Sequence, residues 1–199
     1  MKIEAAIFDI GNVLLLFDYM VAADRLASKN SLTTLPDRER IVSAKQAYET
    51  GGISRAAFLE LVRPEFRDTG EEEDFVRIWE DIFVENLPMT SLARQLAAEM
   101  PVFLISNISC IHWDYISKHY DIFSIFRGHV LSYQVKLLKP DPQIFELAVE
   151  KFNIDPSRTL YFDDLLENVE SASSVGLLGF HYSHTRHADV EAFLSRSSP

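Results

Sequence analysis

The sequence predicts an α/β fold in which a doubly wound parallel sheet carries an inserted helical segment. Three observations lead to this prediction: short apolar segments end in polar residues, amphipathic segments of helical length alternate with them, and one long region near the start offers helices but no convincing strand. The 199 residues, of which 47% are hydrophobic, suffice for one packed core and a modest insertion.

Three short and largely apolar segments are expected to be buried strands. They are Ile3–Phe8, Pro101–Ile105 and Thr159–Phe162, and they run into Asp9, into Ser106 with Asn107, and into Asp163 with Asp164, respectively. In open parallel sheets, ligands bind beyond the carboxyl ends of the strands, where the winding changes direction. We therefore expect these polar residues to converge on one site.

Helical patterns lie between the predicted strands. They cover Ser91–Met100, Pro142–Phe152 and Glu167–Val175, and Gly176 suits the end of the last one. Strands that alternate with helices of this length indicate parallel strands joined by crossover helices.

The region from Asp18 to Leu87 interrupts this alternation. Its clearest helix begins with the acidic residues 71–74, which suit the positive end of a helix dipole. Apolar residues then fall at i, i+3, i+4, i+7 and i+8, namely at Phe75, Ile78, Trp79, Ile82 and Phe83. We expect this aromatic face to pack the insertion's own core. The prediction is a helical cap over residues 17–87, inserted into a core made of residues 1–16 and 88–199.

Composition and charge exclude several classes of protein. The formal net charge of −11 argues against a nucleic-acid partner, because such binding depends on Lys and Arg that neutralise phosphates. No apolar run approaches the ~20 residues that cross a bilayer, and Glu4 and Asp9 interrupt the apolar start, so we expect neither a membrane span nor a signal peptide. The single cysteine, Cys110, excludes an intramolecular disulfide and agrees with a reducing compartment. We expect a cytoplasmic protein.

The polar residues at the strand ends are those that phosphoryl transfer requires. In chain order they are a carboxylate at Asp9, a hydroxyl with a nearby amide at Ser106 and Asn107, a lysine at Lys139, and an acidic pair at Asp163 and Asp164. A phosphate ester repels an anionic nucleophile, so the site must neutralise the phosphate oxygens before a carboxylate can attack. A lysine and a divalent cation do this, and Mg²⁺ needs only one or two protein carboxylates because it keeps several waters. Asp9 and Asp164 fit as those carboxylates.

Four segments resemble, in the correct order, the four motifs of the haloacid dehalogenase superfamily. These segments are FDIGNVL, LISN, LKPDPQIF and YFDDLLENVESA, and they extend from Phe8 to about Ala172. The resemblance implies a Rossmann-like core, a helical cap inserted after the first strand, and Mg²⁺-dependent removal of phosphate from a small metabolite.

The same resemblance assigns roles to individual residues. It implies that Asp9 is a nucleophile that becomes phosphorylated, that Ser106 and the backbone amide of Asn107 hold phosphate oxygens, and that Lys139 offsets the phosphate charge. For the metal it implies Asp9, the backbone oxygen of Gly11, and Asp164.

Two further residues are given supporting roles by the resemblance. Asp163 is expected to be a neighbour of the metal ligands or an alternative ligand. Asn168 is expected beside them too, with a plain position on a helix surface as the alternative.

The sequence departs from the family at Gly11. Most phosphatases of the superfamily have a second aspartate at this position, which gives a proton to the leaving group and later takes one from water. Glycine does neither, and general acid–base help is typically worth ~10²–10⁴ in rate. A leaving group that needs little protonation, a bound water or a cap residue could compensate.

Other acid–base candidates each have a simpler structural explanation. Asp18 is expected to cap the first helix of the insertion. His112 and His129 are expected to lie at the surface or to be satisfied internally. The histidines at 181, 184 and 187 lie near a strand end marked by Phe180 and Tyr182, and they are not expected to bind a metal.

The FDIGNV form and a GGIS turn near Gly51 are similar to those of bacterial sugar-1-phosphate phosphatases of this superfamily. We therefore hypothesise a sugar phosphate as the substrate. Two alternatives remain open: a metal-independent 2-haloacid dehalogenase, and a catalytically weak protein that binds a phosphorylated ligand.

Overall fold

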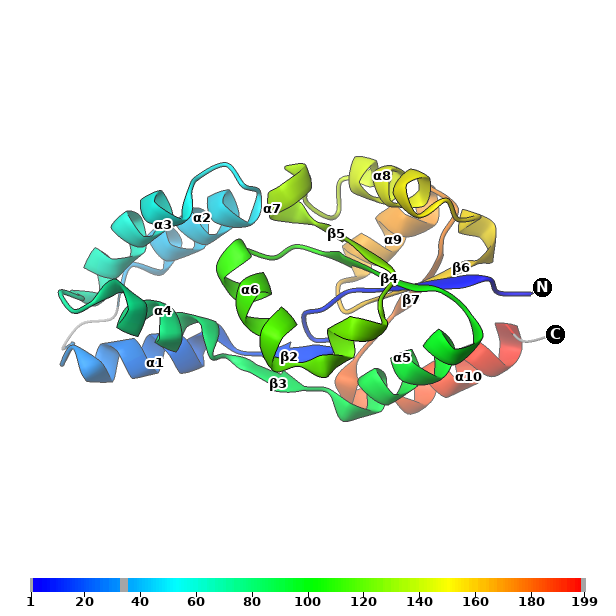
Figure 1. The fold of residues 1–199 in the computed structure, drawn as a ribbon, viewed down its shortest axis with the longest axis horizontal. Helices are drawn as coiled ribbons and strands as arrows, with labels where there is room; N and C mark the ends of the chain where they lie inside the picture. The colour runs from blue at the N-terminus through cyan, green and yellow to red at the C-terminus, as the bar shows by residue number, and fades with distance from the viewer. Residues whose placement is uncertain (1, 33–35, 198–199) are drawn as a thin grey trace.

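The computed structural model describes residues 2–32 and 36–197, and a five-stranded parallel sheet lies at its centre (Figure 1). The strand order is β5-β4-β1-β6-β7. The strands are β1 (Ala5–Phe8), β4 (Val102–Ser106), β5 (Gly128–Leu131), β6 (Thr159–Asp163) and β7 (Leu178–His181). The first strand is in the middle, paired in parallel with β4 on one side and β6 on the other. The winding therefore reverses at β1, which places the carboxyl ends of β1, β4 and β6 at the switch point.

Helices cover both faces of this sheet. One face carries α8 (Pro142–Phe152) and α9 (Leu166–Ser174), and the other carries α5 (Leu87–Glu99) and α10 (Ala188–Ser197), as Figure 1 shows. The helix α6 (Cys110–His119) follows β4, and the short α7 (Ser132–Val135) follows β5. The expected doubly wound α/β class is confirmed.

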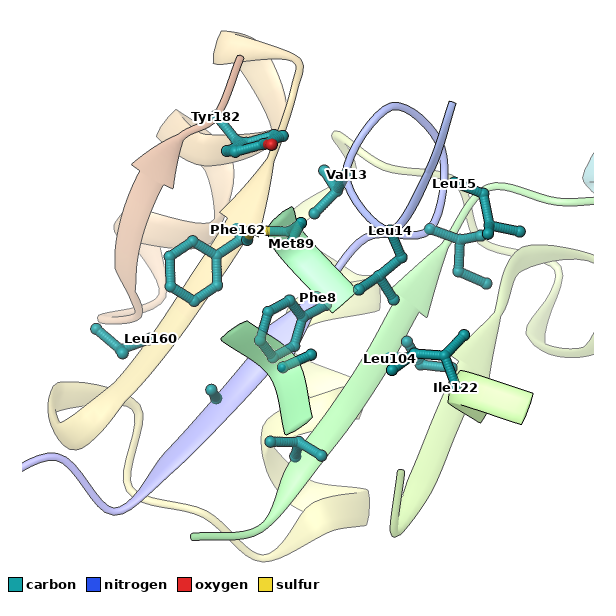
Figure 2. Close-up of a cluster of buried hydrophobic side chains, with 14 of the residues drawn as sticks. Phe8, Val13, Leu14, Leu15, Met89, Leu104, Ile122, Leu160, Phe162 and Tyr182 are labelled. Carbon is teal, nitrogen blue, oxygen red and sulfur yellow. The ribbon is translucent and has the colours of Figure 1, made fainter. Parts of the chain in front are cut away.

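Both faces of β1 are buried, each against a separate apolar cluster. Ala6 and Phe8 face the cluster beneath α5, whereas Ala5 and Ile7 face the cluster beneath α8. Figure 2 shows the first cluster, in which the ring of Phe8 stacks on Phe162 with centroids 5.0 Å apart. Burial on both faces explains why β1 is continuously apolar, and it fixes the residue that follows β1 at the sheet edge.

A two-stranded antiparallel ribbon connects the sheet to the inserted helices. It consists of β2 (Leu15–Phe17) and β3 (Phe83–Glu85). The sequence offered no convincing strand between residues 18 and 87, so β3 corrects that expectation. At three residues, β3 is too short to show an alternating pattern. The Asn86 side chain fastens the base of the ribbon, donating to Val13 O at 2.6 Å and to Tyr182 Oη at 2.9 Å.

Between β2 and β3 lies the helical insertion, which comprises α1 (Tyr19–Lys29), α2 (Arg38–Glu49), α3 (Arg55–Val62) and α4 (Glu72–Glu80). These helices lie at one end of the molecule, away from the two termini (Figure 1). They share an apolar cluster that includes Phe58, Phe75 and Trp79. The expected packing role of the aromatic face is thus confirmed for Phe75 and Trp79.

Helix boundaries differ from the sequence pattern by more than one residue at two places. The periodic pattern continued to Phe83, but α4 ends at Glu80 because Asp81 leaves the helical region and Phe83 pairs with Phe17 in the ribbon. The helix expected from Ser91 begins at Leu87, because a proline in the first turn is compatible with a helix start.

Among the described residues, four short 3₁₀ helices complete the fold, at Arg63–Phe66, Asp121–Ile125, Pro156–Arg158 and His184–Arg186. Within the residues that the structure describes, none of the helices combines the length and apolarity needed to cross a membrane.

Candidate active site

A cavity of about 260 Å³ lies beyond the carboxyl ends of β1, β4 and β6. Its core side contains all the residues that the sequence analysis selected except Asp163, which is fully buried behind it: Asp9, Gly11, Ser106, Asn107, Lys139, Asp164 and Asn168. Strand ends and the loops that follow them place these side chains together although they are up to 159 residues apart in the chain. The expected convergence at the switch point is therefore present.

A buried lysine lies between two carboxylates in this cavity. Lys139 Nζ lies 2.6 Å from Asp163 Oδ2 and 2.9 Å from Asp9 Oδ1, and it donates to Ile105 O at 3.3 Å. Burial by itself lowers the pKa of Lys139, but the charges of Asp163 and Asp9 outweigh burial and raise that pKa. Lys139 is therefore a fixed positive charge beside Asp9.

The Asp9 carboxyl group titrates far from its usual range. Burial is the largest effect and raises the pKa of Asp9 to about 7, while Lys139 opposes the rise and the negative charges of Asp163 and Asp164 add to it. A cation at this position would restore the carboxylate form, because it would favour the charged state.

Both carboxylate oxygens of Asp163 accept hydrogen bonds from neighbouring groups. Its Oδ2 accepts from Lys139 Nζ and from the Tyr161 hydroxyl, and its Oδ1 accepts from the Leu165 N–H and from Asn168 Nδ2, both at 2.9 Å. Burial alone would raise the pKa of Asp163, but Lys139 and these hydrogen bonds outweigh it and lower that pKa. This carboxylate orients Lys139 and has little capacity left for a metal.

Asp9 and Asp164 are the carboxylates that remain to hold a cation, and they form one acidic cluster with Asp163. One oxygen each of Asp9, Asp163 and Asp164 lies within 4.8 Å of the others. Asp9 Oδ1 is buried and has no hydrogen-bond donor of suitable geometry among the described residues, although the ammonium group of Lys139 is near. Asp9 and Asp164 offer carboxylate oxygens, and hard divalent cations such as Mg²⁺ prefer oxygen ligands, so the donor set fits Mg²⁺.

Asp164 is positioned by a residue that the sequence analysis did not select. The side chain of Asn12 donates from Nδ2 to Asp164 Oδ2 at 3.0 Å, across the gap between the β1 and β6 loops. Burial is the largest of the effects that raise the pKa of Asp164. Asn12 has a positive φ of 53°, which asparagine tolerates, and its place in the loop after β1 was the available signal.

Asn107 braces the backbone of Lys139 from both sides. Its Nδ2 donates to Lys139 O and its Oδ1 accepts from the Lys139 N–H, each at 2.9 Å. Its side chain is therefore used for bracing, and only its backbone amide is free for another role. Ser106 is buried at the end of β4 and lines the cavity.

Asn168 is buried in α9, so the helix-surface alternative is excluded. It donates to Asp163 from Nδ2, and its buried Oδ1 has no hydrogen-bond partner among the described residues. Because it also lines the cavity, this oxygen is available to a bound water or ligand.

The opposite wall of the cavity was not anticipated from the sequence. It is formed mainly by the ribbon and the helical insertion, through Phe17, Tyr19, Lys45, Glu49 and Phe83, with His112 of α6. Lys45 Nζ lies 3.3 Å from both carboxylate oxygens of Glu49, and the Tyr19 hydroxyl donates to Glu49 Oε1 at 3.3 Å. The i, i+4 spacing of Lys45 and Glu49 was visible in the sequence, but such pairs usually lie on exposed faces.

The ring of Phe17 fills the space beside Gly11. A Cβ atom added to Gly11 would lie 2.7 Å from Phe17 Cε1 and 3.4 Å from Cδ1. Any larger side chain at position 11 therefore requires the ring to move.

Two of the residues considered as acid–base substitutes have structural partners. Asp18 caps α1 by accepting from the Met20 N–H at 2.8 Å, as expected. His112 is buried, and its Nε2 lies 3.2 Å from Trp79 O. Burial lowers the pKa of His112 to about 4, so it is neutral at pH 7. His112 is thus a satisfied histidine, although it lines the cavity.

The other histidines lie outside the acidic cluster. Burial lowers the pKa of His129, which packs against Trp113 and does not line the cavity. In the described part of the chain, the group of side chains that could hold a metal consists of aspartates and contains none of the histidines at 181, 184 and 187. His181 instead places its Nε2 2.9 Å from Asp164 O.

Comparison with known proteins identifies relatives that span most of the chain. The family model of haloacid dehalogenase-like hydrolases matches residues 3–176. A sesquiterpene phosphatase of Aspergillus oryzae is 27% identical over 180 residues, covering 89% of each chain. A phosphorylated carbohydrates phosphatase of Thermotoga maritima is 26% identical over 179 residues, covering 87% of this chain and 82% of that protein.

Solved structures share the fold. A haloacid dehalogenase family enzyme from Bacteroides thetaiotaomicron, solved as a magnesium complex, matches with a TM-score of 0.81 and 24% identity over 92% of this chain and 95% of that one. A predicted hydrolase of the same type from Porphyromonas gingivalis matches over the full length of both chains, with a TM-score of 0.81 and 18% identity. Since the family model covers residues 3–176, which include the whole candidate site, the chain belongs to the haloacid dehalogenase-like hydrolase family.

Proposed function

We propose that this hydrolase is a Mg²⁺-dependent phosphatase that acts on a small phosphorylated metabolite through a phosphoaspartyl intermediate on Asp9. One observation carries the proposal: Asp9 lies in a cavity between the fixed positive charge of Lys139 and a second carboxylate, Asp164. The phosphatase names of the Aspergillus and Thermotoga relatives support the same reaction class.

The residues that line the cavity on the side of the core take different parts in the proposed reaction. The Asp9 oxygen attacks phosphorus, the bond from phosphorus to the leaving oxygen breaks, and water later cleaves the phosphoaspartate. Lys139, Ser106 and the backbone amide of Asn107 hold the negative oxygens of the phosphoryl group throughout. Asp9, Asp164 and the backbone oxygen of Gly11 would hold Mg²⁺, which would further neutralise those oxygens.

Supporting residues keep this arrangement fixed. Asp163 holds Lys139 through the 2.6 Å ion pair, and Asn168 holds Asp163 in turn. Preorganised charges cost no rearrangement during the reaction, which is the main physical advantage of such a buried network.

We propose further that the helical insertion acts as a cap, with residues 17–87 covering a core made of residues 1–16 and 88–199. The separate apolar cluster of the insertion and its contribution to the cavity wall support this division. A cap at this position would exclude water and contact the leaving group.

The wall of the cavity favours a sugar phosphate as the substrate. The rings of Phe17, Tyr19 and Phe83 offer apolar surface for a sugar ring, and the Lys45–Glu49 pair offers a donor and an acceptor for its hydroxyl groups. The carbohydrate phosphatase among the relatives agrees with this chemistry.

The test is phosphate release from a panel of phosphorylated sugars and other metabolites, with Mg²⁺ and with EDTA. Asp9→Asn is expected to abolish turnover because no phosphoaspartate can form. Asp24→Asn, at an exposed position on α1, is the matched control and should retain activity. Turnover that is unchanged in Asp9→Asn would contradict the proposal, and halide release without metal would identify a dehalogenase instead.

A further inference from the structure

The proposed phosphatase lacks a proton donor at the position next to its nucleophile. Gly11 has no side chain, and the ring of Phe17 occupies the adjacent space. Asn12 is engaged with Asp164 and cannot exchange a proton at neutral pH. The loop after β1 therefore offers no acid for the leaving group beyond the nucleophile itself.

The opposite wall of the cavity offers four groups that carry a titratable proton: Tyr19, Lys45, Glu49 and His112. Burial lowers the pKa of His112 to about 4, and Trp79 O holds its Nε2, so it is neutral and engaged. Burial and the nearby Glu49 raise the pKa of Tyr19 well above its usual value, so its hydroxyl does not ionise. Lys45 is held by both oxygens of Glu49.

Glu49 differs from these three groups because it is a carboxyl group, the same kind of side chain as the aspartate that position 11 lacks. Burial raises the pKa of Glu49 from its ordinary value, although Lys45 and the Tyr19 hydroxyl oppose the rise. A carboxyl group moved toward neutrality is suited to proton transfer in both directions. Its side chain is 11% exposed and faces the cavity.

The backbone of Glu49 is fastened to the core beside the predicted phosphate-binding loop. The buried Ser132 Oγ donates to Glu49 O at 2.6 Å and accepts from the Ile108 N–H at 3.0 Å. Ile108 is two residues beyond Ser106. Two residues beyond Glu49, Gly51 adopts a φ of +64° and packs against Tyr133 O, which leaves no room for a Cβ atom. The end of α2 is thus held in register with the loop that follows β4.

We propose that Glu49, on the inserted helix α2, replaces the missing aspartate as the proton donor and acceptor of this enzyme. This inference rests on the proposed phosphatase function. In the first step, Asp9 bonds to phosphorus, the bond from phosphorus to the leaving oxygen breaks, and the Glu49 proton passes to that oxygen. In the second step, water bonds to phosphorus, its proton passes to Glu49, and the bond from phosphorus to Asp9 breaks. Phosphate leaves and Glu49 is again protonated.

The test compares two leaving groups. Glu49→Gln keeps the size and the acceptor for Tyr19 but cannot exchange protons. With a sugar phosphate, whose leaving alkoxide needs a proton, turnover should fall ~10²–10⁴-fold. With p-nitrophenyl phosphate, the first-turnover burst of nitrophenolate should persist, and only the later steady rate should fall. Glu60→Gln, at an exposed position of the same insertion, is the matched control and should match the wild type.

The pH profile separates proton transfer from a structural role. The groups that face Glu49 are Tyr19 of α1 and Lys45 of α2, and His112 of α6 lines the same cavity. Glu49→Gln should lose the basic limb of kcat/KM for the sugar phosphate. Lys45→Met should move that limb to higher pH, because Lys45 lowers the pKa of Glu49. In Glu49→Ala, added formate should restore part of the turnover.

Different results overturn different claims. A wild type without Asp9-dependent phosphate release from either substrate would overturn the proposed function, and the role of Glu49 with it. A wild type that is active while Glu49→Gln keeps full turnover of the sugar phosphate would overturn only the role of Glu49. Equal losses of turnover in Glu49→Gln with both leaving groups, including loss of the burst, would also overturn only the role of Glu49. So would a basic limb of kcat/KM that stays unchanged in Lys45→Met.

Discussion

Gly11 and Phe17 share one space, so neither residue can be understood alone. The ring lies where a side chain at position 11 would begin, and Phe17 is also held by Phe83 in the ribbon and by Tyr19. The absence of an acid at position 11 is therefore built into the packing of the ribbon, and it is more than a single altered residue in the first motif.

This packing predicts that Gly11→Ala costs about 1–3 kcal/mol of unfolding free energy, because an extra carbon overpacks a filled site. In a Phe17→Leu background the same change should cost less, since leucine lacks the ring atoms that approach Gly11. Urea denaturation of the four proteins in this double-mutant cycle measures the coupling. Gly70→Ala is the control, because its Cβ would meet only ordinary contacts at 3.5 Å or more. Equal costs of Gly11→Ala in both backgrounds would refute the shared space.

One buried histidine contributes to the packing of α6 against α4. The ring of His112 stacks on Trp79 with an interplanar angle of 9°, and it meets Phe83 edge-on. Burial lowers the pKa of His112 to about 4, so the folded protein keeps this ring neutral at a pH where an unfolded chain would protonate it.

This contact predicts a pH dependence of stability. As the pH falls from about 6.5 to about 4, the unfolded state gains a proton on His112 that the folded state refuses, so stability is lost by up to ~1.4 kcal/mol per pH unit. His112→Phe keeps the stack and removes the titration. The difference in unfolding free energy between wild type and variant, measured by urea denaturation, should therefore shift in favour of the variant as the pH falls. A difference that stays constant would contradict this explanation.

At the level of elements, the sequence predicted the three fully buried strands and three of the helices that cover the sheet. The strands β1, β4 and β6 and the helices α5, α8 and α9 were recognised because burial makes strands continuously apolar and helices periodic. The strands β2, β3 and β5 were not, because β2 and β3 have three residues each and β5 begins with a glycine and a histidine. Such segments form strands because they pair with neighbouring strands, and their own sequence does not indicate it.

The residues of the candidate site also divide into those that the sequence predicted and those that it did not. Asp9, Ser106, Lys139 and Asp164 could be selected because each follows a strand or lies in a motif. Glu49 could not, since its burial depends on how α2 packs against the core through Ser132, 83 residues away in the chain. Contacts between distant elements leave no local pattern.

For the whole molecule, the acidic cluster lowers the stability of the fold without metal, in a chain that already carries a net charge of −11. Burial raises the pKa of Asp9 to about 7, so between pH 3.8 and about 7 the folded protein holds a proton that the unfolded chain has lost. Without metal, this group therefore makes the protein less stable as the pH rises through that window.

Magnesium is expected to reverse this effect. At 100 times its dissociation constant, a ligand of the folded state adds about 2.7 kcal/mol to the unfolding free energy. Because Mg²⁺ must displace the proton of Asp9, the rise in melting temperature on adding Mg²⁺ should grow from pH 6 to pH 8. Thermal unfolding with and without Mg²⁺ measures it, and Asp164→Asn should remove most of the shift. An equal shift in that variant would place the cation elsewhere.

The paired strands β2 and β3 also bear on how enzymes of this shape diversify. The chain leaves the core and returns to it at neighbouring positions, since Leu15 is opposite Glu85. The entropic cost of closing a loop grows only with the logarithm of the loop length, so doubling the length costs about 0.6 kcal/mol. Evolution can therefore exchange or enlarge the module between these strands with little effect on the sheet. If Glu49 carries the proton, part of the catalytic machinery lies in the module between β2 and β3, so that exchanging this module would change the substrate and the acid–base chemistry together.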